Sequence, residues 1–279
     1  MYESTNIRRL VADAATLLHA SGESACLEAE VLAAHVLGMS RSLLLAHMDD
    51  VPPPETVTRF YDLVARRAVG EPLPYILGYR EFYGRRFRVT PATLIPRPET
   101  ELLVDRFLKL EPALPSGPIA DVGTGCGCIL ACALLPNGRI GIGTDLSDAA
   151  LQAAAENLAQ HGLSCRTVLV QTDLLRGVRN DSLAAVLANL PYVAEGDPRL
   201  EAQVAEWEPP LALYSGLDGL SLIRRLLPQA AAALKPGGAL ILEVGIGQAD
   251  EVARLLSEWH DLTVLDDLAG IPRVVSARK

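Results

Sequence analysis

The hydrophobic positions in the N-terminal quarter of the chain follow the spacing of amphipathic helices. One stripe comprises Ile7, Leu10, Val11, Ala14, Leu17 and Leu18, and another comprises Val57, Phe60, Tyr61, Val64 and Ala68. Two further helices are predicted, one over residues 24–38 and one through RSLLLAH, which Ser40 can cap. Short connections between them predict a small helical bundle over residues 1–72. The pattern alone fits a stabilising cap and a partner-recognition module equally well.

The pattern changes over residues 73–98, where prolines and glycines separate short runs of alternating aromatic and charged residues. Such runs are typical of a β-hairpin followed by a loop. We therefore predict a β-hairpin linker over this segment. Arg97 lies between two prolines and Glu99 follows the second, so both would be rigidly placed.

From residue 99 to residue 279, apolar strand-like runs alternate with helical patterns. Strands are predicted at 119–122, 140–144, 167–170, 184–188, 239–244, 262–265 and 274–277, and the main helices at 147–161 and 220–234. This alternation predicts an α/β fold with a mostly parallel, Rossmann-like, seven-stranded sheet covered on both faces. The last two strands are too close for a helical crossover and should form an antiparallel hairpin. A ligand crevice is expected beyond the carboxyl ends of the strands.

Composition narrows the class of protein. Hydrophobic residues make up 49% of the chain, and the net charge of -9 argues against broad electrostatic capture of nucleic acid. No apolar run approaches the roughly 20 residues that span a bilayer. The opening MYESTNIRRL lacks the basic and apolar regions of a signal peptide, so we expect a cytoplasmic protein without membrane association.

Five cysteines without disulfide-like spacing suit a reducing compartment. Cys126, Cys128 and Cys132 lie close together, but no further Cys or His is suitably spaced to complete a zinc site. The five histidines are scattered and form no metal-binding pair. We therefore expect no metal and interpret the three cysteines as small buried residues.

The segment ADVGTGCGCIL ends the first predicted strand of the sheet and opens a helix. Gly123, Gly125 and Gly127 would allow a tight turn and a close approach of a ligand to the backbone. Asp145, at the end of the next strand, is placed to accept both hydroxyls of a ribose. A dinucleotide fingerprint would require glycine at Cys128, whereas a DxGxGxG loop with a ribose-binding acid fits S-adenosylmethionine. After the third strand, Asp173 could accept the adenine amino group while Leu174 packs on the ring, although such an Asp is as often a helix cap.

The fourth strand delivers Asn189, Leu190, Pro191 and Tyr192 to the same crevice. None of these side chains is a strong nucleophile or base, but together they can position a planar NH2 group. The Asn189 side-chain carbonyl and the Leu190 backbone carbonyl would accept its two hydrogens, and Tyr192 would offer a stacking face. Holding the nitrogen against a methyl sulfonium is catalysis by orientation, which needs neither a metal nor a dedicated base.

These motifs resemble those of a known family. NLPY resembles the (N/D)PPY signature of methyltransferases that modify planar nitrogens. Together with GYREFYG, LIPRPETE, DVGTGCG and EPPLALYSGLDGL, it makes essentially the whole chain similar to the peptide chain release factor glutamine methyltransferases, the HemK/PrmC family. The resemblance implies a class I S-adenosylmethionine-dependent methyltransferase fold over residues 99–279. It also implies N5-methylation of the GGQ glutamine in bacterial class I release factors, which the N-terminal bundle would recognise.

The resemblance also implies a set of site residues. Cofactor contacts are expected at Gly123, Thr124, Gly125, Cys126, Gly127, Asp145, Leu174 and Asn189, and the substrate glutamine is expected at Asn189, Leu190, Pro191 and Tyr192. Leu190 departs from the family, in which proline is expected at this position. Its proposed role uses only the backbone carbonyl, and Pro191 already favours an extended conformation at residue 190, so we expect activity to survive.

Three alternatives remain open at this level. A glutamine methyltransferase of a ribosomal protein would share the catalytic core and differ in the N-terminal bundle. A non-catalytic S-adenosylmethionine-binding protein would keep the cofactor pocket without transferring a methyl group. The letters NLPY also occur in rRNA adenine dimethyltransferases, but those enzymes need a basic surface that this acidic chain lacks overall.

Overall fold

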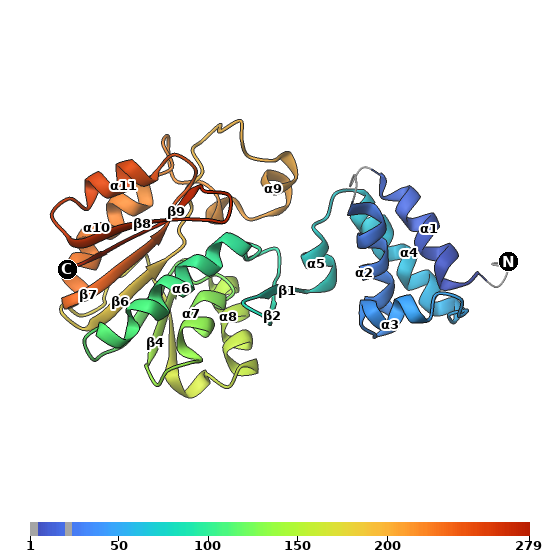
Figure 1. Cartoon of the computed structure of the whole chain (residues 1–279), viewed down its shortest axis with the longest axis horizontal. Helices are drawn as coiled ribbons and strands as arrows, with labels where there is room; N and C mark the ends of the chain where they lie inside the picture. The colour runs from blue at the N-terminus through green and yellow to red at the C-terminus, as the bar shows by residue number, and fades with distance from the viewer. Residues whose placement is uncertain (1–4, 20–23) are drawn as a thin grey trace. The chain divides into compact units, whose positions relative to one another are not determined.

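A computed structural model describes residues 5–19 and 24–279, which divide into two compact units (Figure 1). The first unit ends at Gly78 and the second runs from Tyr79 to Lys279. The division into residues 1–72, 73–98 and 99–279 stays a prediction. The helix α5 (Leu73–Leu77) lies in the first unit, and the hairpin that follows it lies in the second.

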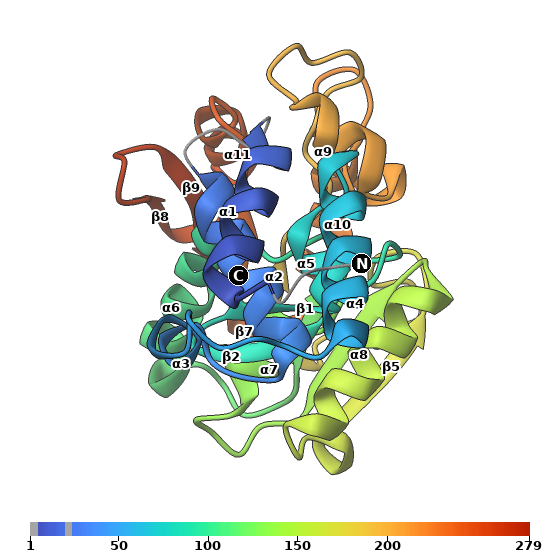
Figure 2. The same cartoon turned by 90° about the vertical axis from the view of Figure 1, so that its right-hand side faces the viewer.

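The first unit is a bundle of short helices (Figure 2). Besides α5, it contains α1 (Ile7–Leu17), α2 (Ala25–Leu37), α3 (Arg41–Ala46) and α4 (Pro54–Ala68). Ser40 caps α3 as predicted, and the Asn6 side chain caps α1 by accepting a hydrogen bond from the backbone of Arg9. The predicted apolar stripes form the core of this unit, except that Leu17 is 55% exposed and Ala68 is also exposed.

The second unit opens with the predicted hairpin, β1 (Tyr79–Phe82) and β2 (Arg85–Arg88). It continues into a seven-stranded sheet with the strand order β5-β4-β3-β6-β7-β9-β8. The strands are β3 (Ile119–Val122), β4 (Gly141–Asp145), β5 (Thr167–Gln171), β6 (Leu183–Ala188), β7 (Leu234–Glu243), β8 (His260–Asp266) and β9 (Pro272–Arg278). The first five are parallel, while β9 is antiparallel to both β7 and β8. The predicted fold class is therefore confirmed.

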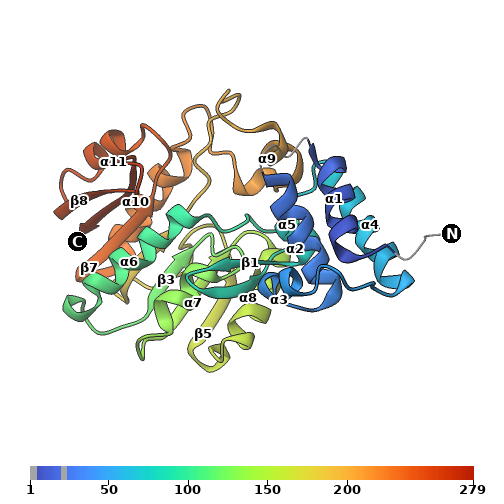
Figure 3. The same ribbon diagram turned by 45° about the vertical axis from the view of Figure 1, so that its right-hand side comes forward.

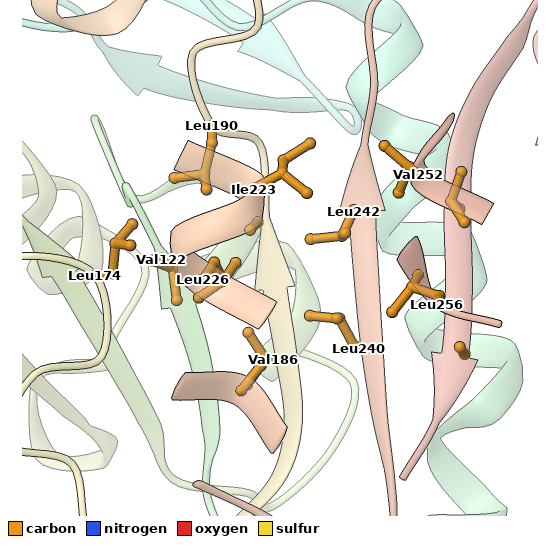
Figure 4. Close-up of a cluster of buried hydrophobic side chains, with 14 of the residues drawn as sticks. Val122, Leu174, Val186, Leu190, Ile223, Leu226, Leu240, Leu242, Val252 and Leu256 are labelled. Atoms are coloured by element: carbon orange, nitrogen blue, oxygen red, sulfur yellow. The ribbon is translucent and has the colours of Figure 1, made fainter. Parts of the chain in front are cut away.

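Helices cover both faces of this sheet. Figure 3 shows α6 (Glu101–Leu110), α7 (Cys128–Leu134) and α8 (Asp148–Gln160) over one face. On the other face, α10 (Ser221–Ala233) packs on β7, and α11 (Ala249–Leu255) packs on β9 and β8. Their apolar side chains belong to one buried cluster (Figure 4). The short helix α9 (Ala202–Trp207) and the 3-10 turns η2 (Pro98–Thr100), η3 (Glu111–Ala113), η4 (Ser164–Arg166) and η5 (Pro210–Ala212) complete the unit. Within residues 5–19 and 24–279, no helix is both long and apolar enough to span a membrane.

The central strands explain why the sequence folds in this way. All residues of β3 and β6 are buried, as expected for parallel strands covered on both faces. β3 pairs with β4 on one side and with β6 on the other, so the order of the strands reverses between β3 and β6. Open α/β sheets bind their ligands beyond the carboxyl ends of the strands at such a point.

Candidate active site

The candidate site lies where three neighbouring strands end. Val122, the last residue of β3, pairs with Thr144 of β4 and with Ala188, the last residue of β6. The glycine loop, Asp145 and Asn189 therefore begin at the same edge of the sheet. This is the crevice that the sequence predicts.

The glycine loop is held against β4 by backbone hydrogen bonds. The amides of Gly123 and Thr124 donate to the Thr144 carbonyl at 2.8 and 2.9 Å. Gly123 has a φ of 70°, a conformation that favours glycine. A Cβ at this position would also lie 3.1 Å from Cδ2 of Leu190. Both the backbone conformation and the neighbouring side chain thus call for glycine here.

A cavity of about 430 Å³ opens above this loop. Most of the predicted cofactor residues line it, namely Gly123, Thr124, Gly125, Cys126, Asp145, Asp173, Leu174 and Asn189, as do Leu190 and Pro191. Gly127 does not line the cavity: it precedes α7 and faces Ala154 of α8. The structure therefore brings the residues of three separate motifs to one cavity. Gly127 lies outside the cavity, where it allows α7 to approach α8 closely.

Asp145 is fixed in the cavity wall by two backbone hydrogen bonds. Its Oδ2 accepts from the Gly125 amide and its Oδ1 from the Ser147 amide, both at 2.9 Å. A carboxylate oxygen can accept more than one hydrogen bond, so both oxygens remain available to donors inside the cavity. The carboxylate is thus held in a defined orientation, which would suit a ligand with a neighbouring pair of hydroxyls.

Asp173 forms an ion pair that the sequence analysis did not predict. Its Oδ2 accepts a hydrogen bond from Arg225 of α10, while its Oδ1 is buried and bonded to no other described residue. Leu174 beside it adopts a φ of 55° and is 6% exposed. The lone buried oxygen and the adjacent apolar side chain form a wall suited to a planar ring that carries an amino group.

Asn189 is oriented by a residue that the sequence analysis did not single out. Its Nδ2 donates a hydrogen bond to Oγ1 of Thr100 at 3.1 Å, and Thr100 is only 2% exposed. Because the amide nitrogen is engaged in this way, the carbonyl oxygen Oδ1 is left to accept other hydrogen bonds. PRPETE, which contains Thr100, was the only sequence signal for this contact.

A second cavity of about 420 Å³ adjoins the first and was not predicted. Asn189 and Leu190 line both cavities, whereas Tyr192 lines only the second. Burial raises the pKa of Tyr192 to about 12, with a further contribution from the nearby carboxyl of Glu243. The phenol therefore stays neutral and is unsuited to act as a base near neutral pH.

The segment EPPLALYSGLDGL folds against the chain that follows Asn189. The amide of Val193 donates to the Leu213 carbonyl at 2.9 Å. Gln248 Nε2 donates to the Tyr192 carbonyl at 2.9 Å. A Cβ at Gly219 would lie 2.1 Å from the same Tyr192 carbonyl oxygen, so only glycine fits there. The contacts of Leu213 and Gly219 give a physical reason for the motif, because they fix the backbone of the NLPY segment and of Val193, and Gln248, outside the motif, adds a further hydrogen bond.

Arg97 also supports the site through a buried partner. Its guanidinium pairs with the carboxylate of Glu208, which is 3% exposed and accepts a hydrogen bond from the Ile95 amide at 3.0 Å. The pair joins the segment before η2 to the segment after α9. Glu99 acts at longer range, because its charge raises the pKa values of Tyr192 and Glu243.

Two carboxyls lie fully buried near the crevice. Burial raises the pKa of Asp121, in β3, to about 7, against a hydrogen bond that its Oδ2 accepts from the Thr124 hydroxyl at 2.6 Å. Burial likewise raises the pKa of Glu243, at the end of β7, to about 7. One oxygen of each carboxyl is buried without a hydrogen bond to any residue in the described part of the chain.

The clustered cysteines are buried, as expected, but only Cys126 and Cys128 line the first cavity. Burial raises the pKa of Cys132 to about 12, and the pKa of Cys128 is also raised, chiefly by a hydrogen bond with Cys126. The thiols of Cys128 and Cys132 are therefore protonated near neutral pH and are poor nucleophiles. No group of metal-binding side chains occurs over residues 5–19 and 24–279.

Both units match known protein families. The model described as the PrmC N-terminal domain matches residues 9–78, and the one described as the methyltransferase small domain matches residues 98–206. Among solved structures, the hMettl16 catalytic domain in complex with MAT2A 3'UTR hairpin 6 is 18% identical, with a TM-score of 0.53 over 78% of this chain and 82% of that one. A 16S rRNA N2-guanosine methyltransferase from T. thermophilus, solved with AdoMet and guanosine, is 16% identical, with a TM-score of 0.52 over 72% and 49%. At these identities the likeness shows a shared fold.

Curated relatives match nearly the whole chain. The release factor glutamine methyltransferase of Bradyrhizobium diazoefficiens is 42% identical over 275 residues, which cover 95% of this chain and 92% of the relative. The enzyme of the same name from Moorella thermoacetica is 42% identical over 274 residues, which cover 96% of each chain. At this identity and coverage, the chain belongs to the release factor glutamine methyltransferase family.

Proposed function

We propose that this protein transfers a methyl group from S-adenosylmethionine to the side-chain amide nitrogen, N5, of the glutamine in the GGQ motif of class I peptide chain release factors. The observation that carries the proposal is the placement of Asn189. It directly follows β6 at the wall shared by both cavities, and its amide nitrogen is engaged by Thr100. The oxygen of its amide is therefore free to bind a hydrogen of an acceptor amide.

The first cavity fits the proposed cofactor. Asp145 would bind the ribose hydroxyls, and the unpaired Oδ1 of Asp173 would accept the adenine amino group while Leu174 contacts the ring. The backbone of residues 123–126 would pass close to the methionine part of the cofactor. A Cβ at Gly123 would displace Leu190 and so obstruct this approach. S-adenosylmethionine, when bound, supplies an electrophilic methyl group.

The residues of the NLPY segment would hold the acceptor. The side-chain carbonyl of Asn189 and the backbone carbonyl of Leu190 would accept the two hydrogens of the glutamine amide. Tyr192, in the second cavity, would give the planar amide a neighbouring aromatic face. Orienting the nitrogen lone pair in this way lowers the barrier by several kcal/mol, an order of magnitude typical of positioning effects.

The proposal extends to partners and location. The helical unit would bind the release factor, a role supported by its match to the PrmC N-terminal domain. We expect no direct binding of nucleic acid, because the net charge of -9 opposes it. The mechanism needs no metal, because orientation of the amide requires no Lewis acid. Since release factors act during translation, we place the enzyme in the cytoplasm.

The test is methyl transfer from labelled S-adenosylmethionine to purified substrates. We expect label in a release factor, none in a release factor whose GGQ glutamine is replaced by glutamate, and none in ribosomal proteins. In the Asn189→Ala variant, kcat/KM should fall by about 100-fold while affinity for the cofactor changes little.

Two results would contradict this function. Label found only in a ribosomal protein would favour the alternative glutamine methyltransferase. Cofactor binding without transfer to any protein would favour a non-catalytic binding protein. Normal turnover by Asn189→Ala would instead refute the positioning mechanism.

A further inference from the structure

Thr100 connects two groups that are far apart in the sequence. It lies at the end of η2, where PRPETE leads into α6, and its hydroxyl accepts the hydrogen bond from Asn189 Nδ2 at 3.1 Å. The carboxyl of Glu243, at the end of β7, lies beside the same hydroxyl, and its hydrogen bond with Thr100 opposes the rise in the pKa of Glu243 that burial causes. Thr100 and Glu243 are each 2% exposed, so water does not compete for these contacts.

Glu243 sits among charges from several elements. Arg273 of β9 faces it, as do Arg97 and Glu99 from the segment before α6, and Tyr192 lies beside it in the chain after β6. The Arg97 guanidinium is already paired with Glu208, and Arg273 is paired with Asp267. Among the described residues, both arginines near Glu243 are therefore paired with other carboxylates. The hydrogen-bonding partner of Glu243 is Thr100.

A hydroxyl carries one hydrogen and can accept at its lone pairs. An ionised Glu243 can only accept, so the hydrogen of Thr100 must point toward it. The Thr100 oxygen is then left with acceptor capacity alone, and it can bind only the NH2 group of Asn189. The amide of Asn189 is thereby prevented from turning over, which would exchange its nitrogen and its oxygen.

We propose that Thr100 and Glu243 are positioning residues which fix the amide of Asn189 with its carbonyl oxygen toward the acceptor. This inference rests on the proposed function and deepens it, since it assigns a role to PRPETE and to the end of β7. Thr100 lines the first cavity, but its role here is to orient Asn189, and neither Thr100 nor Glu243 takes part in the transfer itself.

The arrangement depends on the charge of Glu243. The pKa of this carboxyl is raised to about 7 by burial. A protonated Glu243 can donate to Thr100, which frees the hydroxyl hydrogen to turn toward Asn189 and allows the amide to flip. Turnover should therefore decrease as the pH falls through about 7, and this acid limb should disappear in Glu243→Gln.

The experiment measures steady-state methylation of a release factor and cofactor affinity in matched variants. We expect Thr100→Val to lower kcat by roughly 10- to 100-fold, the cost typical of losing a buried hydrogen-bonding partner, with cofactor affinity and KM nearly unchanged. Thr100→Ser restores the hydroxyl and should recover most of kcat. Thr167→Val is the matched control: its hydroxyl bonds to the Leu163 carbonyl at the amino end of β5, away from the crevice, and its kcat should equal that of the wild type.

Wild-type kcat in Thr100→Val, or equally slow turnover in the Val and Ser variants, would overturn the inference. If Thr100→Val fails to fold and bind the cofactor, Glu243→Gln decides through its pH profile, and an unchanged acid limb would again overturn it. Failure of the proposed function is distinct, because the wild-type enzyme would then leave release factors unmethylated.

Discussion

Leu190 shows how one side chain can shape two cavities. It is 4% exposed, belongs to the buried cluster in Figure 4, and lines both the first and the second cavity. Its Cδ2 lies close to Gly123 of the glycine loop. The expectation that only its backbone carbonyl matters is therefore incomplete, because its side chain also couples the NLPY segment to the loop.

This contact makes a prediction about Gly123. Gly123→Ala should lower the free energy of unfolding and weaken cofactor binding, because the new Cβ would lie 3.1 Å from a Leu190 side chain that is too buried to move freely. Gly177→Ala is the control, since Gly177 also has a positive φ but no atom within 4 Å of its added Cβ. The control should lose only the about 1–2 kcal/mol that a left-handed conformation costs. Urea denaturation and cofactor titration would measure both effects, and equal losses in the two variants would disprove the role of Leu190.

At the scale of elements, the ion pair of Arg97 and Glu208 joins two segments that support the cavities. Glu208→Ala would leave the Arg97 guanidinium without its buried partner and the Ile95 amide without an acceptor. We expect the free energy of unfolding to fall by about 1–3 kcal/mol, because the Ile95 amide loses its acceptor while the Arg97 side chain, which is 33% exposed, can turn to water.

The exposed pair of Arg86 and Glu81 is the control for this change, because both side chains are more than 60% exposed. Glu81→Ala should cost less than about 1 kcal/mol. Denaturant unfolding of both variants gives the comparison. A loss in Glu208→Ala as small as that in Glu81→Ala would mean that the buried pair does not hold the segments together.

Strands were predictable where the strand is buried on both faces, because its sequence is then an unbroken apolar run. The strand predicted at 119–122 coincides with β3, and the other predicted strands overlap β4 to β9. The start of β7 was missed because Pro236, Gly237 and Gly238 read as a turn, whereas the strand begins at Leu234. Helix α5 was missed for the same reason: it follows Pro72 and contains Pro74, and proline reads as a loop signal unless its place in the first turn is known.

Some residues of the site were predictable from the sequence and others were not. The glycine loop, Asp145 and Asn189 are each tied to a strand end, so their meeting follows from the alternation of strands and helices. Thr100 and Glu243 could not be foreseen as partners, because their contact depends on how α6 packs against β7. Arg225 likewise reaches Asp173 only through the packing of α10. Pairings across elements leave little trace in a single sequence.

For the whole molecule, each unit has its own apolar core, and the buried carboxyls Asp121 and Glu243 lie in the second unit. A buried carboxyl whose pKa is raised in the folded state opposes folding at neutral pH. The folded protein holds a proton on Asp121 up to about pH 7, whereas the unfolded chain releases it near the ordinary aspartate pKa of 3.8. Between these values the folded state binds more protons, so this carboxyl makes stability decrease as the pH rises.

Asp121→Asn should remove this effect. Relative to the wild type, the free energy of unfolding of the variant should increase between about pH 5 and about pH 8, by on the order of 2–4 kcal/mol. Asp266→Asn, a change at an exposed position of β8, should show no such trend. Urea denaturation of the three proteins without cofactor at both pH values measures the difference. A constant difference between Asp121→Asn and the wild type would show that Asp121 is already ionised in the folded protein at the lower pH, with its charge accommodated by the hydrogen bond from Thr124.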